Sequence, residues 1–163
     1  MIEKFILDTN VFRFLFTMYY EESSPEIFKG FRKLLSEGNI ISVKEVKEEL
    51  KVQNIDECEE LLNQEKKIFE IPTAEEIVTV RDIFSKPIYK NSVKEKTIRE
   101  GRHFADPFLV AKGSCVENSV VVTTEKPDSN PGKIPNVCEK YGVKHLSFQD
   151  FMKVLRQIGD ECE

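Results

Sequence analysis

Short apolar runs alternate with longer amphipathic stretches along the chain, and this alternation predicts its secondary structure. Residues 5–7 and 120–122 are apolar throughout, which is typical of strands buried on both faces of a parallel sheet. Residues 40–43 are also short and largely apolar, and residues 143–146 carry an apolar residue at each end; the two segments predict two further strands. Between them, apolar residues recur three and four positions apart, as in helices that cover a sheet.

The helices are predicted from this spacing and from their start and stop signals. Ser24 with Pro25 opens one helix, which Gly38 ends, and the sequence from Thr73 to Glu76 fits a capping box for another that runs to Pro87. Further helices are predicted over residues 10–20, 44–50, 55–69, 106–115, 134–141 and 148–158. The segment 10–20 is apolar on nearly all sides, which favours either a core position or a subunit interface, as in a homodimer.

The predicted order of elements is β-α-α-β-α-α-α-loop-α-β-α-β-α. Strands that alternate with helices indicate an α/β fold with a mainly parallel central sheet, flanked by helices in three α/β/α layers. The length of 163 residues and the absence of repeats predict a single domain over residues 1–163.

Charge is unevenly distributed along the chain. The net charge of −5 gives no general attraction for nucleic acid. Residues 86–103, however, contain six basic and two acidic side chains. This segment is either a solvated loop or a local binding site for a polyanion. Five of its residues are candidates for RNA phosphate contacts: Lys90, Lys94, Lys96, Arg99 and Arg102.

The cysteines and the hydropathy pattern narrow the class of protein further. The four cysteines, at positions 58, 115, 138 and 162, form no closely spaced pair, so a zinc knuckle is not expected. The first residues include Glu3 and Asp8, unlike a signal peptide. No apolar run approaches the roughly 18 residues of a membrane helix. The sequence therefore predicts a cytoplasmic protein with no membrane segment.

Carboxylates recur where the predicted strands end. Asp8 follows the first strand and Glu125 follows the strand at 120–122, while Glu49 lies on the helix after the second strand. Asp106 begins the helix before the strand at 120–122. The carboxyl ends of parallel strands share one edge, so these acids can converge there. Convergent carboxylates repel one another unless a cation lies between them, and oxygen ligands suit Mg²⁺ or Mn²⁺.

Each acid also has a structural explanation. Asp8 and Asp106 can cap the helices that follow them, Glu125 can be a turn residue, and Glu49 can be an ordinary exposed glutamate. Their expected position at one edge favours a shared metal site.

Four sequence segments resemble those of the PIN-domain nucleases, in the order found in that family. They are Phe5-Ile-Leu-Asp-Thr-Asn-Val-Phe12, Ile41-Ser42 with Glu49-Leu50, Ala105-Asp-Pro-Phe-Leu-Val-Ala111 and Val121-Val-Thr-Thr-Glu125. Residues 24–28, 41–46 and 134–138 look like a less studied bacterial and archaeal branch, similar to the VapC-type toxin ribonucleases of toxin–antitoxin pairs. The resemblance implies a parallel sheet flanked by helices, an acidic pocket that holds Mg²⁺ or Mn²⁺, hydrolysis of RNA, and an antitoxin protein as a partner.

Carried over by position, the resemblance assigns a catalytic, metal-binding role to Asp8, Glu49, Asp106 and Glu125. Asn10 and Thr123 match the polar residues that accompany these acids. Two choices stay open, because Glu45 competes with Glu49, and Asp128 is an alternative to Glu125, where the family more usually has Asp.

Two other functions are weighed against the nuclease. A PIN-like domain could bind RNA or a partner protein without cutting. Glu125 is compatible with this alternative, because it stands where the family more usually has Asp. A phosphohydrolase with an aspartyl nucleophile would need a second Asp two residues after Asp8, where Asn10 stands. The chain lacks a GxGxxG motif, and Gly132-Lys133-Ile134 lacks the Ser or Thr of a phosphate-binding loop.

Overall fold

The central sheet is parallel throughout. The structure, a computed structural model, describes residues 3–19, 21–64, 66–89, 104–127 and 130–162. In this part of the chain five strands form one sheet in the order β3-β2-β1-β4-β5, and every neighbouring pair is parallel. The strands are β1 (Lys4–Leu7), β2 (Ile40–Val43), β3 (Phe69–Glu70), β4 (Ser119–Thr123) and β5 (His145–Ser147). The predicted α/β class is confirmed.

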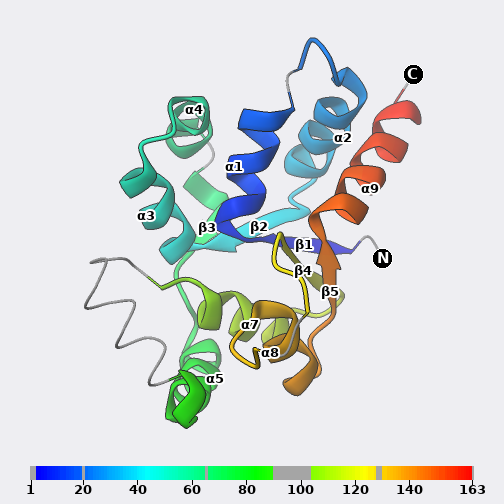
Figure 1. Cartoon of the computed structure of the whole chain (residues 1–163). Coiled ribbons are helices and arrows are strands. Elements are labelled where there is room, and N and C mark those ends of the chain that lie inside the picture. Colours follow the sequence, from blue (N-terminus) through cyan, green and yellow to red (C-terminus); the bar gives the residue numbers. More distant parts are fainter. Residues whose placement is uncertain (1–2, 20, 65, 90–103, 128–129, 163) are drawn as a thin grey trace.

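Helices cover both faces of this sheet (Figure 1). The helices are α1 (Thr9–Met18), α2 (Pro25–Ser36), α3 (Lys44–Gln53), α4 (Asp56–Gln64), α5 (Ala74–Ser85), α7 (Asp106–Cys115), α8 (Ile134–Lys140) and α9 (Phe148–Asp160). Helices α1, α2 and α9 lie on one side, and α7 and α8 on the other, with α5 packed outside α7. Among the described residues, no helix combines the length and apolarity needed to cross a membrane.

The strand order creates a switch point between β1 and β4. The chain moves from β1 outward to β2 and β3, and then returns to build β4 and β5 on the other side. Phe5 of β1 is in register with Ile40 of β2 and with Val120 of β4. Open α/β sheets bind ligands outside the carboxyl ends of their strands at such a point. Asp8 directly follows β1 at this point.

One predicted helix is wrong at its end. The stretch 55–69 is predicted as one helix, but α4 ends at Gln64, and a 3₁₀ turn (Lys66–Ile68) leads into the edge strand β3. Phe69 pairs with Ser42 of β2 and its ring lies 5.7 Å from that of Phe12. Burial of the Phe69 ring and pairing with β2 therefore favour a strand here over the helix that the spacing of apolar residues predicts. The last strand also lies later than predicted, at His145–Ser147 instead of 143–146.

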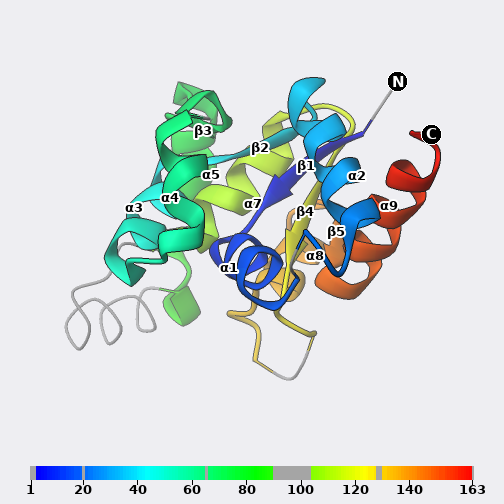
Figure 2. The same ribbon diagram turned by 90° about the horizontal axis from the view of Figure 1, so that it is seen from above.

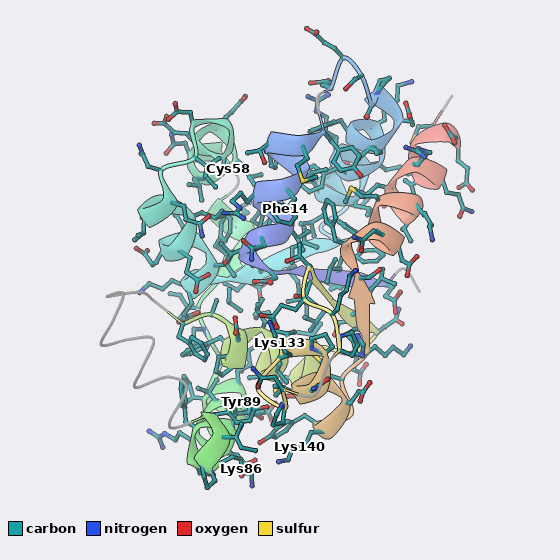
Figure 3. All side chains as sticks on the ribbon, in the orientation of Figure 1. Phe14, Cys58, Lys86, Tyr89, Lys133 and Lys140 are labelled. Atoms are coloured by element: carbon teal, nitrogen blue, oxygen red, sulfur yellow. The ribbon has the colours of Figure 1, made fainter. Side chains whose placement is uncertain are left out.

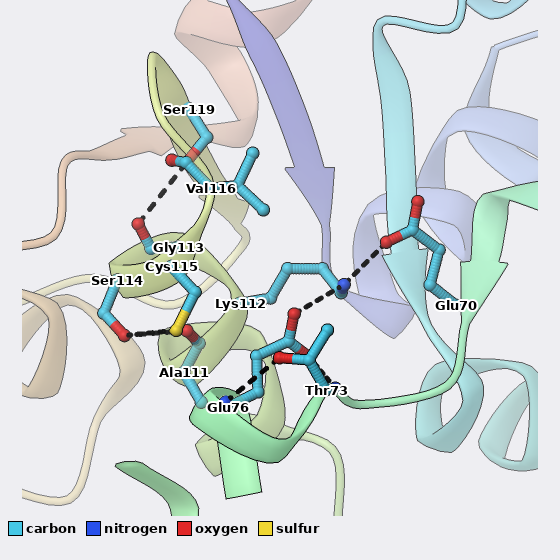
Figure 4. Close-up of polar contacts among 10 residues, drawn as sticks. All are labelled: Glu70, Thr73, Glu76, Ala111, Lys112, Gly113, Ser114, Cys115, Val116 and Ser119. Carbon is cyan, nitrogen blue, oxygen red and sulfur yellow. Dashed lines mark hydrogen bonds and ion pairs between the residues drawn. The ribbon is translucent and has the colours of Figure 1, made fainter. Parts of the chain in front are cut away.

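A buried lysine ties α7 to α5 and β3 (Figure 4). The Nζ of Lys112 donates to Glu70 at 2.7 Å and to Glu76 at 3.0 Å, and its side chain is 1% exposed. Burial alone lowers the pKa of Lys112, but the bonds to the two carboxylates outweigh it and raise the pKa. Glu76 also forms the predicted capping box with Thr73. These ion pairs hold α7 against α5 and β3.

Helices α2 and α9 cross at two glycines. A Cβ at Gly30 would overlap the carbonyl of Leu155, and a Cβ at Gly159 would overlap the carbonyl of Glu26. The two backbones therefore pack in direct contact, which only glycine permits at these two positions.

The apolar helix α1 is only partly core. Val11, Phe12 and Leu15 are buried, whereas Phe16 and Tyr19 line a groove of about 890 Å³ that α1 shares with α2 and β2. The alternative of a homodimer interface stays a prediction.

Candidate active site

Asp8 lies at the switch point between β1 and β4. Its backbone N–H donates to the carbonyl of Val122 at 3.1 Å and so extends the ladder beyond Leu7. Its side chain is the N-cap of α1, where Oδ1 accepts from the Thr9 N–H at 2.6 Å. Oδ2 accepts from the Thr123 hydroxyl at 3.2 Å. Asp8 is 5% exposed, and its carboxylate is held by donors from α1 and β4.

Glu49 reaches the same edge from α3. Its Oε2 accepts from the Thr9 hydroxyl, and its Oε1 accepts from the Ala105 N–H at 3.1 Å. Val46 and Leu50, on the inner face of α3, are fully buried and fix the helix against the core. Glu49 therefore joins the start of α1 to the residue that precedes α7. Of the two candidates on α3, it is Glu49 and not Glu45 that makes these bonds.

Glu125 approaches from the end of β4. Its backbone N–H donates to the Thr123 hydroxyl at 3.1 Å, and its Oε2 accepts from the Ile134 N–H at 2.7 Å. The side chain thus binds the first backbone amide of α8. Glu125 combines a structural contact with a place beside Asp8, whose pKa its charge raises.

Asp106 is the first residue of α7, and the alternative explanation that it caps this helix is wrong because Ala105 occupies the N-cap position. It is half-buried and adjoins the amide that binds Glu49. Tyr89 is nearby, below the sheet in the view of Figure 3, and its hydroxyl donates to the Pro131 carbonyl at 2.7 Å. Burial raises the pKa of Tyr89, and Cys138 and Asp106 raise it further.

The two polar residues predicted to accompany the acids, Thr123 and Asn10, differ in their contacts. Thr123 contacts both Asp8 and Glu125, as its place beside them suggests. Asn10 is half-buried in the first turn of α1, and its side chain makes no hydrogen bond to another described residue.

Six residues named above lie outside the described ranges: Lys90, Lys94, Lys96, Arg99, Arg102 and Asp128.

The pKa of Asp8 reflects its burial and the charges around it. Burial is the largest cause that raises this pKa, from 3.8 to about 7. The charges of Glu125 and Glu49 raise it further, and the hydrogen bonds from Thr9 and Thr123 lower it in part. Glu49 and Glu125 therefore each lie close enough to Asp8 to repel its charge.

This raised pKa predicts a pH-dependent stability. Between the unfolded pKa of 3.8 and the folded pKa of about 7, the folded protein binds more protons at Asp8, so the free energy of unfolding falls as the pH rises. The fall attributable to Asp8 is at most about 4 kcal/mol. We expect urea denaturation at about pH 5 and about pH 8 to show about 3 kcal/mol of this loss in the wild type and a smaller loss in Asp8→Asn. An identical pH dependence in both proteins would contradict the assignment.

The carboxylates do not stand in coordinating geometry. Within the described ranges, no group of three His, Cys, Asp or Glu side chains is arranged to hold a metal ion. The oxygens of Asp8, Glu49 and Glu125 instead accept hydrogen bonds from the hydroxyls of Thr9 and Thr123 and from backbone amides. Carboxylates that repel one another are expected to bind such donors when no cation is between them.

Sequence reasoning missed several groups at this edge. Thr9 contacts both Asp8 and Glu49, and its only signal is its place directly after Asp8. The amides of Ala105 and Ile134 bind Glu49 and Glu125, and backbone donors of this kind leave no mark in a sequence.

The fold and this edge define an α/β/α protein in which a buried aspartate at the switch point of a parallel sheet is repelled by two partly exposed glutamates. The chain belongs to the family described as a domain of unknown function (DUF4411), whose family model matches residues 5–157. Neither the curated proteins nor the solved structures include a match to this chain.

Proposed function

We propose that the protein is a metal-dependent endoribonuclease that hydrolyses RNA phosphodiester bonds. The observation that carries this proposal is the convergence of Asp8, Glu49 and Glu125 at one edge, where burial and repulsion raise the pKa of Asp8 to about 7. Buried carboxylates held in this way are uncommon unless a site uses them. The resemblance of residues 24–28, 41–46 and 134–138 to VapC-type proteins supports a role as the toxin of a toxin–antitoxin pair in the cytoplasm.

The donor set fits a hard divalent cation. Asp8, Glu49 and Glu125, with Asp106 at the start of α7, would hold Mg²⁺ or Mn²⁺ through oxygen ligands. A bound ion of this type neutralises the carboxylates, activates water and stabilises the oxyanions of an in-line attack on phosphate.

The chain's own contribution is to position these acids. The Thr123 hydroxyl at the end of β4 orients Asp8, and the Thr9 hydroxyl orients Glu49. Both hydroxyls can rotate to follow a carboxylate that shifts towards a cation, so the bonds need not be lost. The Ile134 amide places Glu125 on the loop after β4.

Cleavage of RNA by metal-free and metal-restored protein tests the proposal. We expect protein treated with EDTA to leave end-labelled single-stranded RNA intact, and added Mn²⁺ or Mg²⁺ to restore cleavage on a denaturing gel. Asp8→Asn protein purified in parallel controls for contaminating nucleases. Failure to cut any RNA in the presence of either metal would overturn the proposal.

A second function, binding RNA or a partner protein without cutting, is favoured by one observation. The Oε2 of Glu125 is engaged with the Ile134 amide, which leaves this acid less available to a metal. Isothermal titration with Mn²⁺ separates the two functions. A nuclease should bind Mn²⁺ at a site that Asp106→Asn weakens, whereas a binding protein should show no such site.

A further inference from the structure

The outward face of α1 adjoins the acidic edge. Val11, Phe12 and Leu15 point into the core, so the residues at helical spacing on the opposite side face outward. These residues are Asn10, Arg13, Phe14 and Thr17, and all four are partly exposed. Figures 1 and 2 show α1 rising from the carboxyl end of β1, nearly end-on when seen from above.

Arg13 is the basic residue of this face. It lies four residues after Thr9, about 6 Å along the helix axis, and Thr9 is the residue whose hydroxyl donates to Glu49. Side chains four apart lie on the same side of a helix. The sequence therefore places one cation about one helical turn from the carboxylates.

The guanidinium of Arg13 is held against an aromatic ring. Its Cζ lies 5.0 Å from the centroid of the Phe14 ring, and that ring packs edge-on against Phe148 at 5.9 Å. Figure 3 shows Phe14 on α1 above the sheet. With the residues the structure describes, Arg13 forms no ion pair, whereas Arg32 is paired with Glu21. The stack on Phe14 limits the freedom of the arginine and leaves its N–H groups available.

We propose that Arg13, supported by Phe14, binds a backbone phosphate of single-stranded RNA next to the phosphate that is hydrolysed at the acids. This inference rests on the proposed function. A polyanion that approaches Asp8, Glu49 and Glu125 is repelled by them, and a cation one turn away offsets part of that repulsion. A guanidinium suits this role because it donates a fork of hydrogen bonds to phosphate oxygens.

Fluorescence anisotropy with a labelled single-stranded RNA of about 12 nucleotides tests the proposal. The titrations are made in EDTA, so that the RNA stays intact, and at several salt concentrations. One phosphate contact on a single strand contributes a salt slope of about 0.7, or about fivefold in affinity at about 0.1 M salt. We therefore expect Arg13→Gln to weaken binding about fivefold and to lower the slope by about 0.7.

Two further variants act as controls. Arg13→Lys keeps the charge and should keep the salt slope while losing part of the affinity, because the planar fork is gone. Arg81→Gln removes an exposed arginine from α5, on the other side of the sheet, and should bind like the wild type. Thermal melting of each variant shows whether the fold is retained.

The outcomes separate this inference from the nuclease proposal. If the wild type cleaves RNA but Arg13→Gln binds it with unchanged affinity and salt slope, the role of Arg13 is overturned and the nuclease stands. If the wild type cuts no RNA but Arg13→Gln still loses affinity and slope, the phosphate contact stands and the nuclease fails. Absence of RNA binding by the wild type overturns the role of Arg13.

Discussion

Asp8→Asn should abolish metal-dependent RNA cleavage and at the same time make the metal-free protein more stable. The amide keeps the shape of the side chain and can still accept from the Thr9 N–H, so the cap of α1 is retained. It removes the charge that Glu49 and Glu125 repel. We expect a loss of cleavage of at least about a thousandfold, which corresponds to about 4 kcal/mol. The free energy of unfolding at about pH 8 should rise by up to about 4 kcal/mol.

The opposite signs of these two effects make the test specific. A residue with only a structural role loses activity and stability together when it is replaced, whereas a ligand in a strained acidic site does not. Glu48→Gln is the matched control, since Glu48 lies beside Glu49 on α3 but pairs with Lys51. This variant should cleave RNA like the wild type. An Asp8→Asn protein with full activity would contradict the nuclease proposal.

Gly30→Ala should destabilise the protein by at least about 3 kcal/mol, although alanine is the better helix former. In an uncrowded helix this change is expected to stabilise by about 1 kcal/mol. Here the added methyl group would overlap the Leu155 carbonyl, so α9 must move away from α2. In a domain of this size a loss of about 3 kcal/mol lowers the melting temperature by about 6–12 °C.

The control for this prediction lies next to Gly30. Lys29 is exposed on α2, and Lys29→Ala should leave the melting temperature nearly unchanged. Calorimetry or thermal circular dichroism measures both variants. A Gly30→Ala protein with a melting temperature at or above that of the wild type would show that α2 and α9 are not in backbone contact.

Much of the fold follows from local patterns. Three of the five strands described here, β1, β2 and β4, are buried along all or nearly all of their length, and the capping box at Thr73 marks the start of α5. Strand β3 could not be predicted, because two residues carry too little pattern. Its stability comes from pairing with β2 and from the contact of Phe69 with Phe12, which are both distant in sequence.

The candidate site was predictable in its acids but not in its contacts. Asp8 directly follows one apolar strand and Glu125 lies two residues after another, which is a local signal, and the parallel sheet brings them together. The choice of Glu49 over Glu45 depends on which side chain faces Thr9, and only the packing of α3 decides that. Arg13 did leave a signal, as a charged residue in an otherwise apolar helix.

The most direct test of the central claim is a crystal structure of the protein with Mn²⁺, in which anomalous scattering locates the metal. The account predicts a peak at the carboxyl edge of β1, with oxygens of Asp8 and of at least one of Glu49, Asp106 and Glu125 at about 2.1 Å. Carboxylates more than about 10 Å apart with no peak between them, or a metal bound elsewhere, would contradict it.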